Sequence, residues 1–195
     1  MNPFLAFREI LSMYVDEKSL NLLPQLWNEK SRFYHSTNHL IQILQDIEKD
    51  IEFKELNVYE KHALLLSAFF HDAIYDPRKK DNEERSIDLF VNSFKDKTDT
   101  QMLNTVKKLI EVTKYRKRPI DKLQRIMWDA DNAGFKKGYD TLLKNEKLIA
   151  QEYFFVPKKE YKQKRIEFLK TNIGLFNSSV NKDLEKLIKY VEKTY

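Results

Sequence analysis

Glycine and proline, the residues that most often interrupt a helix, are scarce in this sequence. The chain has 195 residues but only 3 glycines and 5 prolines. Between them, apolar residues recur at intervals of three and four, which is typical of amphipathic helices, and no segment shows the alternation of a half-buried strand. The sequence therefore predicts an all-α protein, with helices over residues 4–15, 20–30, 37–50, 58–72, 82–95, 99–114, 120–130, 138–153, 159–171 and 179–194.

Length and composition predict one folded domain. A chain of this size can bury one ordinary apolar core, and the short connections favour a single compact multi-helix bundle over residues 1–195. Hydrophobic residues make up 42% of the chain and both signs of charge are abundant, which excludes the disordered class. The segment "YDPRKKDN" is the most evident surface loop, and we find no repeat or linker.

The absence of cysteine limits the chemistry of the chain. It excludes disulfides, thiolate metal sites and cysteine nucleophiles, so a metal would need histidine nitrogen and carboxylate oxygen. Charges interrupt every apolar run, which predicts neither a signal peptide nor a membrane span, and we expect a cytoplasmic protein. The net charge of +5 is scattered and no nucleic-acid motif is present, which disfavours nucleic acid as a partner.

The few histidines are clustered in a way that suggests a site. "RFYHSTNHL" contains His35 and His39, and "AFFHDAIYD" contains His71 followed directly by Asp72. On the expected helices, His39 lies at the edge of an apolar stripe and His71 shares a face with apolar residues. Both imidazoles are therefore expected to point into the core.

An inward histidine and an aspartate at a helix C-terminus both need a partner of opposite charge. A divalent cation meets that need, so His39, His71 and Asp72 form a partial ligand set between facing helices. The segment "IMWDADNAGF" offers Asp129 and Asp131 as a further carboxylate, and we favour Asp131, with Asp129 in a supporting place. Such ligands accept manganese, iron, cobalt, nickel, zinc or magnesium. Taken singly, each histidine also fits an ordinary core position.

Four motifs now stand in order: "YHSTNHL", "FHDAIYD", "NEERS" and "DAD". Together they resemble the HD superfamily of metal-dependent phosphohydrolases, and most closely its small subfamily of predicted phosphohydrolases, over roughly residues 30–155. The resemblance implies an HD-type helical domain with one divalent ion on His39, His71, Asp72 and Asp131. It also implies hydrolysis of a phosphoester in a nucleotide or other small phosphorylated molecule by a metal-activated water.

The "YHxxxH" pattern is also similar to that of cyclic-nucleotide phosphodiesterases, which are longer proteins. That resemblance implies that His35 donates a proton to the leaving group and that His39 binds the metal. If the helix starts near Ser36, His35 lies at its N-terminal edge. Binuclear relatives use further histidines as ligands, but only His62 is left here and we expect it at the surface. A single ion is therefore favoured, although Asp72 and a water could bridge a second.

Cations and polar residues near these motifs are candidates for supporting roles. Arg32 is the first candidate to neutralise charge on the phosphate, with Lys114 and Arg116 behind it. The alternative, which we favour for all three, is solvated charge at the surface. In "DNEERS", Asn82 and Glu83 would orient a metal-bound water or simply cap a helix. Both interpretations stay open.

Later residues match further motifs of the same subfamily. The matching positions are occupied by Glu152 and Tyr153, and then by Tyr161 and Arg165. Aromatic residues at helical spacing usually belong to the core, and we favour that interpretation here.

Two other functions remain open. HD scaffolds with two irons act as oxygenases, but this chain lacks the additional histidines that would favour them. A metal-binding regulatory or ligand-binding module without turnover is the main alternative, and the intact histidine and aspartate motifs favour an enzyme over it. The sequence does not indicate an oligomeric state.

Overall fold

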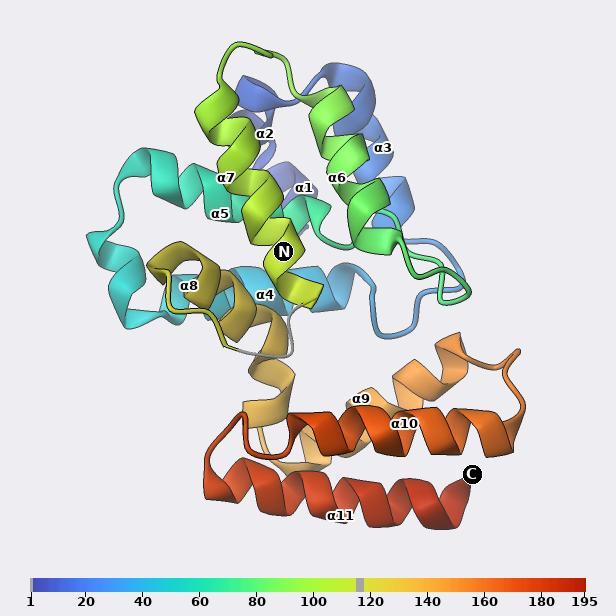
Figure 1. The fold of residues 1–195 in the computed structure, drawn as a ribbon. Coiled ribbons are helices and arrows are strands. Elements are labelled where there is room, and N and C mark those ends of the chain that lie inside the picture. Colours follow the sequence, from blue (N-terminus) through green and yellow to red (C-terminus); the bar gives the residue numbers. More distant parts are fainter. Residues whose placement is uncertain (1, 115–117) are drawn as a thin grey trace. The chain divides into compact units, whose positions relative to one another are not determined.

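The computed structural model describes residues 2–114 and 118–195 (Figure 1). Within them, eleven α-helices and three 3-10 helices are joined by short connections. The part of the chain that is described contains no strand, only an isolated antiparallel bridge between Val15 and Phe94. The predicted all-α class is therefore confirmed. None of the described helices is long and apolar enough to cross a membrane.

The described chain gathers into two compact units. The first contains residues 2–114 and 119–131, and the second contains residues 118 and 132–195. The prediction that they form one domain stays a prediction.

The first unit is built around one buried helix, α5 (Val58–Phe70), whose residues 63–70 are all buried. The helices α4, α6, α7 and α8 contact it. The elements of this unit are α1 (Pro3–Ala6), α2 (Arg8–Tyr14), α3 (Glu17–Trp27), α4 (Thr37–Lys49), η1 (Ile51–Glu55), α5, α6 (Asn82–Ser93), α7 (Thr100–Glu111), η2 (Val112–Lys114) and α8 (Lys122–Asp131).

Local capping explains where several helices begin. Asn57 and Glu60 form a reciprocal capping box at the start of α5. The Asp16 carboxylate accepts a hydrogen bond from the Ser19 backbone N–H, so α3 begins three residues earlier than the sequence predicted. The expected helix over residues 4–15 is divided at Phe7, whose ring packs edge-on against a core ring of α5. All other predicted helices are confirmed, with small shifts at their ends.

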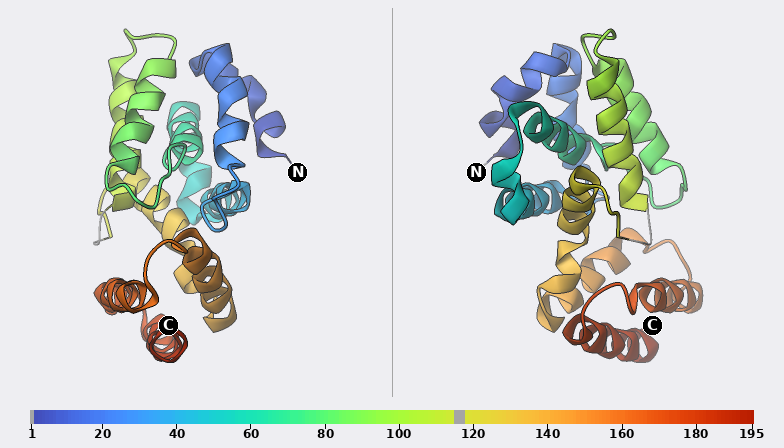
Figure 2. Two further views of the ribbon diagram at one scale, coloured as in Figure 1. Left: turned by 90° about the vertical axis from the view of Figure 1, so that its right-hand side faces the viewer. Right: turned by 60° about the vertical axis from the view of Figure 1, so that its left-hand side comes forward.

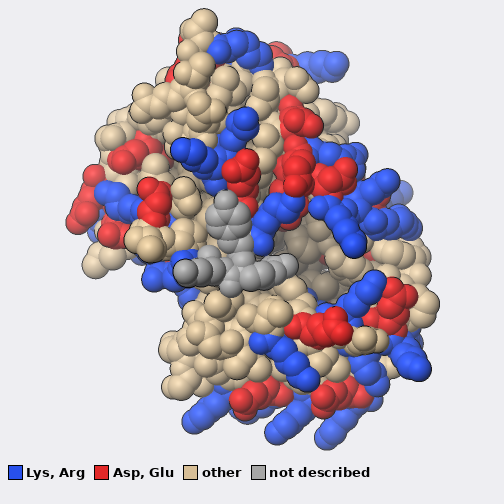
Figure 3. Space-filling view, viewed as in Figure 1, with Lys and Arg blue, Asp and Glu red and all other residues tan. Residues whose placement is uncertain are grey.

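The second unit contains η3 (Asn132–Lys136), α9 (Tyr139–Glu152), α10 (Lys158–Asn172) and α11 (Ser178–Thr194). Figures 1 and 2 show α10 and α11 side by side. A small apolar core joins these helices through Leu142, Leu169, Val180, Leu184, Leu187, Ile188 and Val191. On the face shown in Figure 3, basic and acidic side chains are interspersed, as expected for solvated helix surfaces.

Candidate metal centre

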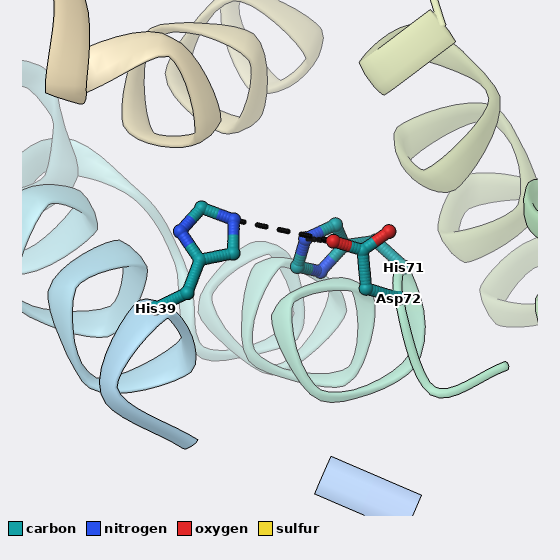
Figure 4. A group of neighbouring side chains, drawn as sticks. All are labelled: His39, His71 and Asp72. Atoms are coloured by element: carbon teal, nitrogen blue, oxygen red, sulfur yellow. Dashed lines mark ion pairs between the residues drawn. The ribbon is translucent and has the colours of Figure 1, made fainter. Parts of the chain in front are cut away.

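The ends of three helices bring four candidate ligands together within the first unit. His39 lies in the first turn of α4, and His71 caps the C-terminus of α5, with Asp72 following it directly. Asp131 is the last residue of α8. Figure 4 shows the side chains of His39, His71 and Asp72 pointing toward one another. The two imidazoles are buried, with exposed fractions of 5% and 1%.

Each imidazole faces both carboxylates through its Nε2 atom. His39 Nε2 lies 3.3 Å from an Asp131 oxygen and 4.0 Å from an Asp72 oxygen. His71 Nε2 lies 3.2 Å from Asp72 and 3.8 Å from Asp131. One ligand atom each from His39, His71 and Asp72 lies within 4.8 Å of the others. This buried group could hold a metal ion.

The bonding of His71 tests whether this donor set fits a metal. Its Nδ1 lies 3.0 Å from the Ala68 carbonyl oxygen, which can only accept, so Nδ1 carries a hydrogen. Nε2 is buried and has no partner with hydrogen-bond geometry among the described residues. A nitrogen held in place through its other ring nitrogen, and left without a hydrogen bond, is what a histidine ligand requires. The residues therefore fit a metal.

The electrostatics of His71 and Asp72 favour a positive charge between the ligands. Burial alone would lower the pKa of His71, but the negative charges of Asp72 and Asp131 outweigh it and raise that pKa to about 9. Burial would raise the pKa of Asp72, but the charge of His71 outweighs it and holds that pKa well below its usual range. Without metal, a proton on His71 thus supplies the charge that a divalent cation would supply on binding.

The C-terminal end of α5 is fixed by contacts to its last carbonyl groups, which have no partner inside the helix. The Ala68 carbonyl accepts a 3.0 Å hydrogen bond from His71 Nδ1, and the Phe69 carbonyl accepts one of 2.9 Å from Trp27 Nε1. The Phe70 carbonyl accepts from the Ala73 N–H at 3.1 Å. These bonds hold His71, and therefore Asp72, at one position.

His35 lies beside the four residues but outside α4. Ser36 is the N-cap of that helix, so His35 occupies the N-terminal edge, as expected for a helix that starts near Ser36. Its ring centroid is 5.9 Å from that of His39, and it stacks on Tyr75 at 4.1 Å. The imidazole is half-buried, and its role as proton donor stays a prediction.

Arg32 is almost fully enclosed, with a side-chain exposure of 1%, rather than solvated at the surface as expected. Its guanidinium donates to the carbonyl oxygens of His35, Asp72 and Ala73 and to the Glu29 carboxylate, at 3.4, 2.5, 2.8 and 3.1 Å. Four of its five N–H donors are therefore already engaged. The expected contact with phosphate stays a prediction, whereas these bonds support a positioning role.

The polar residues after the His71 turn are held by other partners. The Asn82 side chain accepts from the Asp76 N–H and donates to the Asp76 carbonyl, both at 3.0 Å, and so fixes the loop before α6. Lys114 forms ion pairs with Glu83, at 3.7 Å, and with Glu84. Their expected roles toward metal or phosphate stay predictions. Arg116 lies outside the described residues.

The two aspartates of "DAD" point in different directions, because residues two apart on a helix are about 200° apart. Asp131 faces the histidines, whereas Asp129 lies 3.2 Å from Arg125. Arg125 also pairs with Asp50 at 3.1 Å and with Glu52. This geometry agrees with the choice of Asp131 over Asp129 as the candidate ligand.

Glu152 and Arg165 belong to the second unit. Glu152 is buried, and Arg165 donates a 2.6 Å hydrogen bond to Glu146, which also accepts one from Tyr161 at 2.7 Å. The core interpretation of Tyr161 is confirmed, since it is 7% exposed. Sequence reasoning missed the fully buried Glu146, although an acid four residues after Leu142 on an apolar stripe indicated it. A role for Glu152 or Arg165 in the candidate site stays a prediction.

His62 differs from its expected surface position. It is half-buried near the start of α5, and its Nδ1 lies 2.8 Å from the Tyr14 hydroxyl. Burial lowers the pKa of this imidazole below its ordinary value.

In comparisons with known proteins, no family model matches the chain and no curated protein matches it. The function is therefore argued from the residues of the site.

Proposed function

We propose that this protein is a metal-dependent phosphohydrolase of the HD type that cleaves a phosphoester in a nucleotide or other small phosphorylated molecule. The observation that carries the proposal is the meeting of His39, His71, Asp72 and Asp131 at three helix ends. The order of these residues in the chain, and the motifs around them, resemble the HD superfamily.

The four side chains would hold one divalent ion through two imidazole nitrogens and two carboxylates. Such a bound ion supplies an acidified water and positive charge for phosphate oxygens. The protein supplies the rest: Ala68 orients the His71 ring through Nδ1, and the Trp27 indole holds the end of α5 that carries Asp72. Manganese, iron, cobalt, nickel, zinc and magnesium all suit these nitrogen and oxygen ligands.

His35 is the proposed general acid. It lies next to His39 and is only half-buried, so its imidazole is accessible to a substrate that approaches the ligands. In this role it gives its proton to the departing alkoxide, a contribution typically worth roughly 100- to 10,000-fold in rate. The proposal thus separates the two histidines of "YHSTNHL" into a proton donor and a ligand.

The test begins with elemental analysis of untagged protein purified without chelator. The metal-replete protein is then assayed on a panel of nucleotides and other phosphoesters, with a chelator-treated sample as the control. We expect close to one metal per chain and release of phosphate or a phosphomonoester. Metal without turnover on the panel would favour the regulatory or ligand-binding module instead.

The Asp72→Ala variant ties that result to the proposed ligands. We expect it to lose the metal and the hydrolytic activity while its far-UV circular dichroism stays close to that of wild type, because α5 ends before Asp72. Stoichiometric metal in this variant would show that Asp72 is not a ligand and would contradict the assignment of the site.

A further inference from the structure

We infer that Tyr75 and Arg32 are positioning residues that fix the imidazole of His35 beside the candidate metal centre. The inference rests on the proposed function for its meaning in catalysis. Its structural content, the placement of one imidazole by an aromatic ring and a guanidinium, is testable without turnover.

The first observation is the packing around His35. Its ring lies 4.1 Å from the Tyr75 ring at an interplanar angle of 25°, a stacked arrangement. The Tyr34 ring meets it nearly at right angles, with centroids 4.8 Å apart. His35 precedes α4 and Tyr75 lies in the loop after α5, so neither side chain is oriented by a regular helix. Aromatic rings therefore pack against the imidazole on two sides.

The second observation is that Arg32 joins the same two segments. Its guanidinium donates to the backbone carbonyl of His35 on one side and to those of Asp72 and Ala73 on the other. It also lies over the rings of Tyr75 and Trp27, at 5.6 and 5.7 Å from their centroids. Trp27 in turn holds the end of α5. The column of Trp27, Arg32, Tyr75 and His35 thus links the proposed proton donor to the segment that carries Asp72.

The chemistry of arginine explains why this residue suits the position. A planar guanidinium donates several hydrogen bonds in fixed directions and stacks on aromatic faces, and a lysine ammonium does neither in the same way. Placement to within about 1 Å matters, since a displacement of that size can cost about 100-fold in rate. A charge needed only for solubility would not be enclosed to 1% exposure.

Two pairs of variants isolate the stack. Tyr75→Leu removes the ring, whereas Tyr75→Phe retains it as the matched control. Arg32→Lys retains the charge but loses the planar donor group. Arg8→Lys is its control, because Arg8 is exposed and pairs with Glu17 at the surface. Circular dichroism first checks that every variant is folded.

The first readout is proton NMR of the metal-free protein at one fixed pH. A ring stacked at 4.1 Å should shift the His35 ring protons upfield, and the His35→Ala spectrum identifies these signals. We expect the upfield shift to disappear in Tyr75→Leu, to persist in Tyr75→Phe and Arg8→Lys, and to shrink in Arg32→Lys. An unchanged shift in Tyr75→Leu would overturn the inference, whatever the activity of the protein.

The second readout is a double-mutant cycle on the metal-replete enzyme. We expect kcat of Tyr75→Leu to fall by roughly 100-fold, the scale of one general acid, with KM and metal content near wild type. The same substitution should have little further effect in a His35→Ala background. An equal fall in both backgrounds would overturn the inference, because Tyr75 would then act independently of His35.

The two readouts separate this inference from the proposed function. If wild type shows no turnover but Tyr75→Leu loses the upfield shift, the positioning of His35 stands and the hydrolase proposal fails. If wild type hydrolyses phosphoesters and the shift is unaffected by Tyr75→Leu, the hydrolase proposal stands and the positioning inference fails.

Discussion

The four histidines of this chain have three kinds of surroundings, and these decide what each imidazole can do. His39 and His71 are buried and face two carboxylates. His35 is half-buried against aromatic rings, and His62 contacts the Tyr14 hydroxyl. Only the first two have both the burial and the negative partners that a cation site requires.

This difference predicts that His35→Ala separates metal binding from turnover. We expect the variant to keep its metal, because the His35 ring is next to the ligands and is not one of the four residues that meet there. We expect kcat to fall by roughly 100-fold or more through loss of the proton donor. Parallel metal analysis and steady-state kinetics check this. Loss of metal would mean that His35 and His39 have exchanged roles.

At the scale of elements, α5 sets the geometry of the first unit. Its start is fixed by a capping box, and its end is fixed by side chains that bind its last carbonyl groups. Near its start, His62 and Tyr14 join α5 to α2 through one polar contact. The pKa of His62, near the start of α5, is therefore lowered, whereas that of His71, at its end, is raised.

The contact between α2 and α5 predicts a pH dependence of stability. Burial lowers the pKa of His62 in the folded state, so the unfolded state binds a proton more readily. Neutral His62 contributes to the free energy of unfolding above its unfolded-state pKa of about 6.5. That contribution is lost as the pH falls through the lower pKa that His62 has in the folded state. NMR titration should give a midpoint below 6.5 for His62.

Urea unfolding completes this test. The free-energy difference between wild type and His62→Gln should shrink between pH 7.5 and pH 5, since the substitution removes the titrating group. A His62 midpoint above 6.5, or a difference that grows as the pH falls, would contradict the assigned environment.

At the scale of the whole molecule, the candidate ligands all belong to one of the two compact units. The second unit has its own core and its own buried ion pair between Glu146 and Arg165. Removal of one partner from a buried pair typically costs about 3 kcal/mol or more. Because the candidate ligands belong to the other unit, loss of this ion pair should leave them in place.

The Glu146→Gln variant tests this separation. We expect the free energy of unfolding to fall by about 3 kcal/mol, because the substitution removes the charge of the fully buried Glu146 from its pair with Arg165. Metal content at low temperature should match wild type. Glu160→Gln, which removes an exposed partner of Lys164, is the matched control and should unfold like wild type. Loss of metal in Glu146→Gln alone would show that the ligands depend on the second unit.

The helices were largely predictable because their signals are local. Scarce glycine, apolar periodicity and caps such as Asn57 depend on neighbouring residues only, and the predicted elements are confirmed apart from the division at Phe7. That division depends on packing against a ring of α5, some 60 residues away in the chain, which periodicity cannot register. The 3-10 helices η1 and η3 were missed because such short turns carry almost no periodicity.

The ligands of the candidate site were predictable from the sequence, but the residues that hold the site in place were less so. His39, His71 and Asp72 stand out by residue type and helix face, and helical geometry favours Asp131 over Asp129. The enclosure of Arg32 by three carbonyl groups depends on how distant segments fold together. The same holds for the stack of Tyr75 on His35, since no short-range pattern encodes it.

The most direct test of the account is the metal content of two variants whose substitutions lie two residues apart on the same helix end. Asp131→Asn removes a carboxylate that faces both histidines, whereas Asp129→Asn removes one that faces Arg125. We predict that Asp129→Asn retains close to one metal per chain and that Asp131→Asn loses most of it under identical purification. Equal metal in both variants, or loss from Asp129→Asn alone, would contradict a centre built from His39, His71, Asp72 and Asp131.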